Sequence, residues 1–215
     1  MKRIENEEMK EHILDAVAVC KVKAAGEEVS LTQISSQAGI SERTLNRYYP
    51  DKELLIYEAA VKYMRKRYEA FADIYHETDH YGMSALDRLI SLIQLQAEYY
   101  QADTNMAKVF VRAFTTALRT AVYRNLPHTG YDASCRQIVI DCIEQGIKDG
   151  SMREDLVPMD VYILISSNFN GLVQRLIHMY SVCFTEEAYK RELSIVFQKY
   201  IAMVQEYLSA KGRQM

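Results

Sequence analysis

Residues 30–55, which read SLTQISSQAGISERTLNRYYPDKELL, specify two short helices that meet at a glycine. Ser30 and Gln33 have the spacing of a capping box, in which the hydroxyl accepts from the Gln33 backbone N–H and the glutamine side chain reaches back. Gly39 can take a left-handed backbone conformation without strain, so it ends the first helix. Ser41 then caps the second helix. The pattern predicts helix-turn-helix packing.

The apolar and polar side chains of this segment fall on opposite faces. Those expected to point inward are Ile34, Ala38, Ile40, Leu45 and Tyr48. The outward face of the second helix carries Glu42, Arg43, Thr44, Asn46 and Arg47. Such side chains form hydrogen bonds with base edges and phosphates, and the amino end of this helix would enter the major groove. Positive charge is sparse here, so charge alone leaves open a helix-turn-helix that contacts only protein.

Residues 31–55, together with the helix predicted at about residues 6–25, resemble the DNA-binding signature of the TetR family of transcriptional regulators. The resemblance implies an all-α fold of about nine helices, which agrees with the helical periodicity of the chain. The first fifty residues break into short helical pieces while the rest predicts long helices, and this contrast indicates two domains. A three-helix DNA-binding domain would occupy residues 1–50, and a helical ligand-binding and dimerisation domain residues 51–215.

The same resemblance implies which side chains meet DNA. Tyr49 closes the reading helix and Lys52 opens the next one, where a phosphate is favoured. Asn46 stands where the family usually has a tyrosine on the DNA backbone, so it either holds a phosphate or reads a base such as adenine. Tyr48 either contacts the backbone or packs inward. The expected contacts are Thr32, Ser41, Glu42, Arg43, Thr44, Asn46, Arg47, Tyr48, Tyr49 and Lys52.

Beyond residue 50 the sequence predicts long helices with brief connections. Apolar residues recur at steps of three and four from Leu54 to Tyr75, which predicts one helix that links the two domains. Further helices are expected at about 84–101, 103–123, 131–149, 158–183 and 185–211. The last two have wide apolar stripes, and a helix that is apolar on two sides must bury both. The resemblance implies a homodimer formed through this pair.

Aromatic and methionine side chains are candidates to line a ligand pocket. The chain has 16 Tyr and 10 Met but no Trp. A pocket lined in this way suits a flat or apolar small molecule, although an ordinary core with tyrosines at its rim has the same composition. The candidates are Tyr75, Tyr99, Tyr100, Met106, Phe110, Phe114 and Asn168.

Composition excludes several classes of protein. With 49% hydrophobic and 26% charged residues the chain is globular, and a net charge of −3 argues against a generally basic surface. No apolar run reaches the length of a membrane span, and the acidic start lacks a signal-peptide core, so we expect a cytoplasmic protein. No catalytic constellation, phosphate loop or metal set has motif spacing. We therefore expect neither an enzyme nor a cofactor.

The expected function is that of a ligand-responsive transcriptional regulator, most readily a repressor. It would bind a palindromic DNA operator as a homodimer and be released by a small molecule. The alternative is an all-helical small-molecule-binding protein or enzyme whose helix-turn-helix contacts protein.

Overall fold

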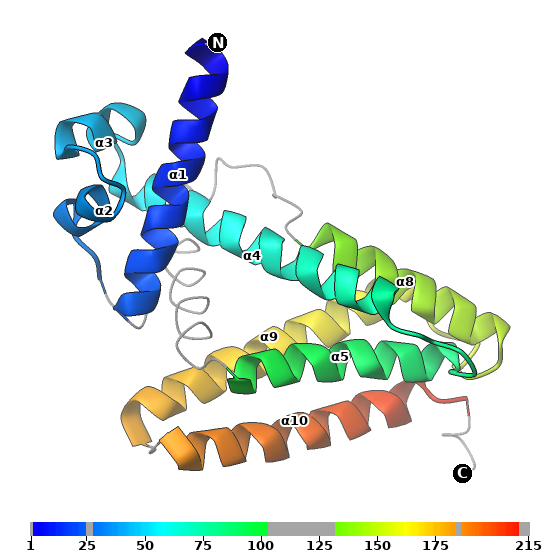
Figure 1. Cartoon of the computed structure of the whole chain (residues 1–215). Coiled ribbons are helices and arrows are strands. Elements are labelled where there is room, and N and C mark those ends of the chain that lie inside the picture. Colours follow the sequence, from blue (N-terminus) through cyan, green and yellow to red (C-terminus); the bar gives the residue numbers. More distant parts are fainter. Residues whose placement is uncertain (1, 25–27, 103–131, 184–185, 211–215) are drawn as a thin grey trace. The chain divides into compact units, whose positions relative to one another are not determined.

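The computed structural model describes residues 2–24, 28–102, 132–183 and 186–210 (Figure 1). Eight helices lie within these ranges, which confirms the all-α prediction. They are α1 (Lys2–Lys23), α2 (Leu31–Gln37), α3 (Glu42–Tyr48), α4 (Lys52–Glu77), α5 (Ala85–Ala102), α8 (Ala133–Lys148), α9 (Pro158–Cys183) and α10 (Glu186–Leu208). The helix predicted at 103–123 lies outside the described residues. Within them, no helix combines the length and apolar character needed to cross a membrane.

The described residues form two compact units that divide inside α4. The N-terminal unit holds residues 2–66, and the C-terminal unit holds residues 67–102 and 132–210. The sequence placed the domain boundary at residue 50. The first half of α4 groups with the N-terminal unit because Leu55 and Ala59 are buried in the same core as α1, α2 and α3. Lys62 adds ion pairs to Glu11 and Asp15 of α1, at 2.6 and 2.7 Å.

The N-terminal unit has one small apolar core. Its members come from helices α1 to α4 and from residues that directly flank α2 and α3, and they are Ile13, Leu14, Val17, Cys20, Val29, Ile34, Leu45, Tyr49, Leu55 and Ala59. Ile40 and Tyr48 pack against this cluster and are partly buried. The inward face predicted for the helix-turn-helix is therefore confirmed.

In the C-terminal unit, α5 packs against both α8 and α10, and α9 packs against the same two helices (Figure 1). Phe169 of α9 stacks on Phe197 of α10 with ring centroids 5.1 Å apart. The connection after α8 lies close to that helix. A Cβ added at Gly146 would come within 2.6 Å of Cγ of Met152, so only glycine fits there without a shift.

Candidate nucleic-acid interface and effector cavity

Both helices of the helix-turn-helix begin at a serine cap. The Ser30 hydroxyl accepts from the Gln33 N–H at 3.1 Å, while the Ser30 N–H donates to Oε1 of Gln33 at 2.8 Å. Ser41 accepts from the Thr44 N–H at 3.1 Å. Between the helices, Gly39 has a φ of +65°. The capping box, the second cap and the glycine corner are thus confirmed.

The interior of the corner is tightly closed. Ile34 of α2 and Leu45 of α3 have no exposed surface, and Ser35 is also buried. The Ser35 hydroxyl donates to the carbonyl of Thr32 at 3.1 Å, so its polarity is satisfied within α2. His12 of α1 donates from Nε2 to the Ala38 carbonyl at 2.9 Å. This bond holds the corner at the end of α2 against α1.

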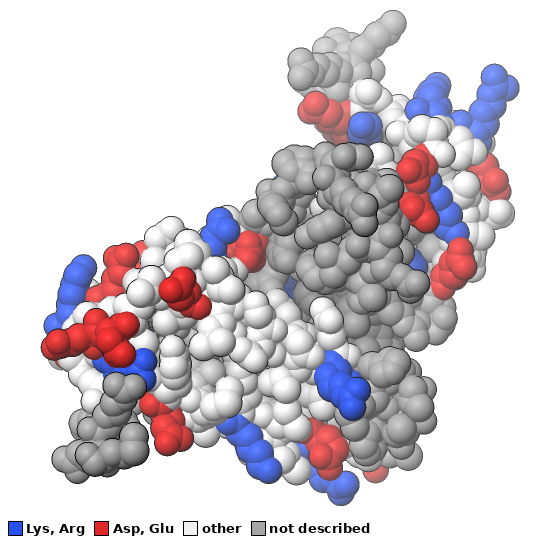
Figure 2. All heavy atoms as spheres, turned by 180° about the vertical axis from the view of Figure 1, so that it is seen from behind, with Lys and Arg blue, Asp and Glu red and all other residues white. Residues whose placement is uncertain are grey.

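The outer face of α3 presents polar side chains to solvent. Glu42, Arg43, Asn46 and Arg47 are exposed, whereas Thr44 is half-buried. Arg43 and Arg47 form no ion pair with any residue that the structure describes, so their guanidinium groups are available to an outside acceptor. On the face in Figure 2, the basic and acidic side chains of the described residues are interspersed.

The two tyrosines at the end of α3 differ in position. Tyr48 is half-buried, and the Arg47 guanidinium lies 5.2 Å from its ring centroid. Tyr49 is only 2% exposed, and its hydroxyl donates to Glu58 at 2.9 Å. Burial and the Glu58 carboxylate raise the pKa of Tyr49. The Tyr49 side chain therefore packs within the N-terminal unit, and its DNA contact stays a prediction.

Lys52 lies at the first residue of α4, with its side chain 34% exposed. Its ammonium is 2.9 Å from Oε1 of Glu28. Next to it, the Asp51 carboxylate accepts from the backbone N–H groups of Glu53 and Leu54, at 2.8 and 3.3 Å. Both the ammonium and the helix terminus expected to hold a phosphate are thus occupied by carboxylates of the chain itself.

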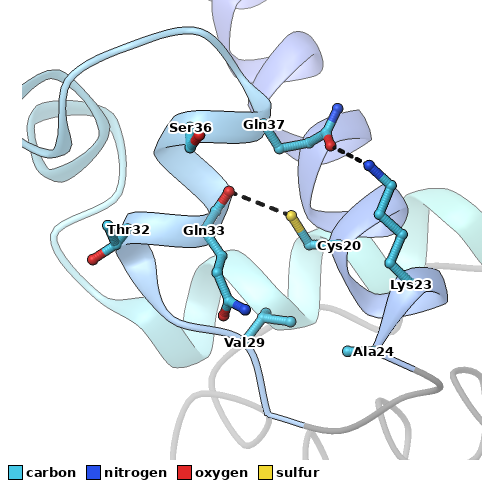
Figure 3. Close-up of a pocket in the computed structure, with 8 residues that line it drawn as sticks. All are labelled: Cys20, Lys23, Ala24, Val29, Thr32, Gln33, Ser36 and Gln37. Atoms are coloured by element: carbon cyan, nitrogen blue, oxygen red, sulfur yellow. Dashed lines mark hydrogen bonds between the residues drawn. The ribbon is translucent and has the colours of Figure 1, made fainter.

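A hollow of about 600 Å³ lies beside α2, between it and the end of α1 (Figure 3). It is lined by Cys20, Lys23, Ala24, Val29, Thr32, Gln33, Ser36 and Gln37. Lys23 donates to Oε1 of Gln37 at 2.9 Å across one side, and the Cys20 thiol points to the Gln33 carbonyl at 3.6 Å. Of the expected DNA contacts, Thr32 and its exposed side chain border this hollow.

The C-terminal unit contains a small cavity of about 40 Å³ between its helices. Four helices contribute its walls, which are formed by Tyr68, Leu92, Ile93, Gln96, Asp132, Cys135, Val139, Tyr162, Ile165, Ser166, Phe169 and Asn170. The Tyr162 hydroxyl donates to the Asp132 carboxylate, and burial together with this carboxylate raises the pKa of Tyr162. The cavity has room for water but is far below the roughly 300–1,000 Å³ of typical ligand sites.

None of the four described residues predicted to bind ligand is in the wall of this cavity. Tyr99 and Tyr100 surround the Arg67 guanidinium, which is 5.5 and 4.5 Å from their ring centroids. Tyr75 is half-buried, with its hydroxyl 3.1 Å from the Cys142 sulfur. Asn168 is exposed on α9 and donates to the Leu164 carbonyl at 2.7 Å. The other three candidates, Met106, Phe110 and Phe114, lie outside the described residues.

Sequence reasoning missed Arg67. It is 5% exposed and is the buried charged residue of the described ranges. Its guanidinium also lies over the rings of Tyr68 and Phe71, at 5.1 and 5.6 Å. Its spacing could have indicated that it is buried, since Arg67 follows Met64 by three residues and precedes Phe71 by four on the buried stripe of α4.

Comparisons with known proteins place this architecture. No protein-family model matches the sequence, and no curated protein matches it. Solved structures do match over nearly the whole chain. The transcriptional regulator FadR from Bacillus subtilis, in complex with stearoyl-CoA, is 18% identical with a TM-score of 0.63 and covers 94% of this chain and 98% of its own.

Two further structures agree. A putative transcriptional regulator from Saccharomonospora viridis in complex with choline is 20% identical, with a TM-score of 0.64 and coverage of 89% of this chain and 96% of its own. A TetR family transcriptional regulator from Chloroflexus aurantiacus is 18% identical, with a TM-score of 0.57 and coverage of 94% of both chains. The chain therefore has the fold of the TetR-family transcriptional regulators.

Proposed function

We propose that the chain is a TetR-family transcriptional regulator that binds duplex DNA through α3 and responds to a small molecule in its C-terminal unit. The observation that carries this proposal is the outer face of α3. There Arg43, Asn46 and Arg47 are exposed on a short helix that is capped by Ser41 and packed from behind by Leu45. A rigid helix that offers such side chains suits the major groove.

The chemistry of this face suits base recognition as well as phosphate binding. Arginine donates in a fork to the O6 and N7 atoms of guanine, and asparagine pairs in the same bidentate manner with adenine. Arg43 and Asn46 are the candidates for these two contacts. Arg47, whose guanidinium lies against the Tyr48 ring, is the better candidate for a phosphate.

Homodimerisation through α9 and α10 is supported by apolar side chains at their surface. Among the described residues, large apolar side chains that are at least 39% exposed include Met159, Ile163, Leu164, Ile195, Met203 and Tyr207 on these two helices. Such side chains are stabilised when a second copy covers them. A twofold dimer would present two copies of α3, as a palindromic operator requires.

The dimer proposal has its own test in solution. Leu164→Lys should convert the dimer to monomer in sedimentation experiments, because the lysine would be buried without a partner at the interface. Ile74→Lys is the matched control, since Ile74 of α4 is 45% exposed and Leu164 is 46% exposed. Equal masses for both variants would contradict an interface on α9.

The effector would act through α4. Tyr68 of α4 lines the small cavity, and Leu55 of the same helix is buried in the N-terminal core. A ligand larger than this cavity must displace its walls, so its binding energy would act on Tyr68. Two proteins of similar fold hold stearoyl-CoA and choline, which supports a small-molecule effector. Release of DNA by the effector would make the chain a repressor.

Selection of duplexes from a pool with a random centre tests the DNA-binding function. We expect an inverted repeat whose half-sites are about one helical turn apart or a multiple of it, roughly 34–36 Å per turn. Affinity should fall as salt rises, with each phosphate contact adding about 0.9 to the logarithmic slope. A chain whose helix-turn-helix contacts only protein would enrich no sequence, and that result would refute the proposal.

A further inference from the structure

We propose that Glu28 competes with DNA for Lys52. In the free chain the Glu28 carboxylate binds the Lys52 ammonium, and it must leave before that ammonium binds a backbone phosphate. This inference rests on the proposed function. It assigns a role in DNA affinity to an acidic residue that precedes the helix-turn-helix and lies outside all of its predicted contacts.

The geometry places the two charges in direct contact. Nζ of Lys52 donates to Oε1 of Glu28 at 2.9 Å, across 24 residues of chain. This hydrogen bond and the ammonium charge hold the pKa of Glu28 below its ordinary value, so the carboxylate is ionised at neutral pH. Glu28 is the partner that can leave, since its side chain is 87% exposed while that of Lys52 is 34% exposed.

The backbone N–H groups beside Lys52 are also bound by a carboxylate of the chain. The first free N–H groups of a helix attract anions, and at α4 those of Glu53 and Leu54 already bind the Asp51 carboxylate. The Lys52 ammonium at this terminus can exchange one acceptor for another when Glu28 leaves. In the free chain the Glu28 carboxylate binds this ammonium in place of the phosphate.

Removing the competitor should strengthen DNA binding. An exposed ion pair is worth a modest amount, so we expect Glu28→Gln to bind about two- to fivefold more tightly at low salt. The gain should shrink at high salt, where exposed charges are screened. A positioning role for Glu28 predicts the opposite sign, because loss of the contact would then leave Lys52 unordered and weaken binding.

The experiment measures fluorescence anisotropy of a labelled 30-base-pair duplex recovered by the wild-type chain from a random pool. Glu53→Gln is the matched control, because it removes an equal charge from the first turn of α4, where no described ion pair holds it. Lys52→Gln completes a double-mutant cycle. In the wild-type background we expect Glu28→Gln to increase the affinity for DNA. In the Lys52→Gln background its gain in affinity should be no larger than that of the Glu53→Gln control.

Three outcomes would overturn the proposal: an unchanged affinity for Glu28→Gln, a weaker one, or an equal gain for Glu53→Gln. Thermal unfolding of each variant shows that the fold is retained. If the wild-type chain recovers no duplex at all, the proposed function itself fails. If it recovers one and only the Glu28 effect is missing, this inference alone fails.

Discussion

The helix-turn-helix and the small cavity are built from residues at very different sequence separations. The caps and corner of the N-terminal unit join residues three to five apart, such as Ser41 with Thr44. The cavity wall joins Tyr68 to Tyr162, from helices far apart in the chain. Local hydrogen-bonding patterns can be read from a single sequence, whereas a cavity depends on how several helices pack.

A second difference lies in what each region must do. The face of α3 is exposed and preformed, so its proposed partner can bind without moving the unit. The cavity is small, so a proposed ligand larger than the cavity must move α4, α5, α8 or α9. Mutations should therefore have different effects in the two regions, because the face of α3 acts as a rigid surface and the cavity acts through packing.

The largest effect should come from the two cores. Leu45 and Leu89 have no exposed surface, and replacing either with alanine should cost about 2–5 kcal/mol of unfolding free energy. We expect Leu45→Ala to abolish DNA binding while the dimer mass persists, whereas Leu89→Ala should weaken both. Anisotropy and sedimentation measure the two properties. If Leu45→Ala lowered the dimer mass as strongly as Leu89→Ala, the units would not be energetically separate.

Glycine substitutions should distinguish packing from backbone conformation. Gly146→Ala forces Met152 to move, and we expect a loss of about 1–3 kcal/mol in urea unfolding. Gly39→Ala meets no atom within 4 Å but keeps a φ of +65°, which should cost about 1–2 kcal/mol. Gly39→Asn should cost less, since asparagine tolerates this conformation. An unchanged stability for Gly146→Ala would show that the connection after α8 is loose.

A smaller loss should follow removal of a cap. Ser41→Ala leaves the Thr44 N–H without its acceptor, and we expect about 1 kcal/mol of destabilisation. Hydrogen exchange of the Thr44 amide should accelerate by a corresponding factor. Ser36→Ala is the control, because Ser36 is exposed and its hydroxyl caps no helix, so its change should stay within about 0.5 kcal/mol. Equal exchange rates in the two variants would mean that the cap contributes nothing.

The smallest effect should be a pH dependence of the contact between α1 and α4. Burial tends to raise the pKa of Asp15, but the Lys62 ammonium more than offsets it, so this pKa lies below the ordinary 3.8. The stabilisation is therefore present above pH 4 and is lost as pH falls through the lowered value. Asp15→Asn should cost less than about 1 kcal/mol at pH 7, since the Asp15 side chain is 56% exposed.

Urea unfolding at several pH values checks this prediction. The wild-type chain should lose its advantage over Asp15→Asn as pH falls below about 4, where the carboxylate becomes protonated. An advantage that persisted at pH 2 would show that the side chain acts through packing rather than charge.

Much of the fold could be predicted because caps and periodicity are local. The helix expected at 158–183 has those bounds in the structure, and the corner at Gly39 has the expected conformation. The site was harder to predict at residues that could lie either at the surface or in the core. Tyr49 follows the last turn of α3 and points to Glu58, a contact that depends on how α4 packs.

The cavity could not be predicted for a related reason. Its wall uses Tyr68, which the apolar stripe of α4 included, but also Asp132 and Gln96, which look like ordinary surface residues in the sequence. Arg67 lies on the same stripe as Tyr68 yet is charged, so composition alone would assign it to solvent. Which polar residue of a helix is buried depends on its neighbours from other helices.

The central claim is that the exposed face of α3 binds duplex DNA, and charge reversal at Arg43 tests it most directly. We expect Arg43→Glu to weaken binding of the selected duplex by at least about 100-fold, because a lost base contact is compounded by phosphate repulsion. Lys148→Glu, an equal reversal at the exposed end of α8, should leave affinity nearly unchanged. Equal affinities for Arg43→Glu and the wild-type chain, with both folded, would contradict the account.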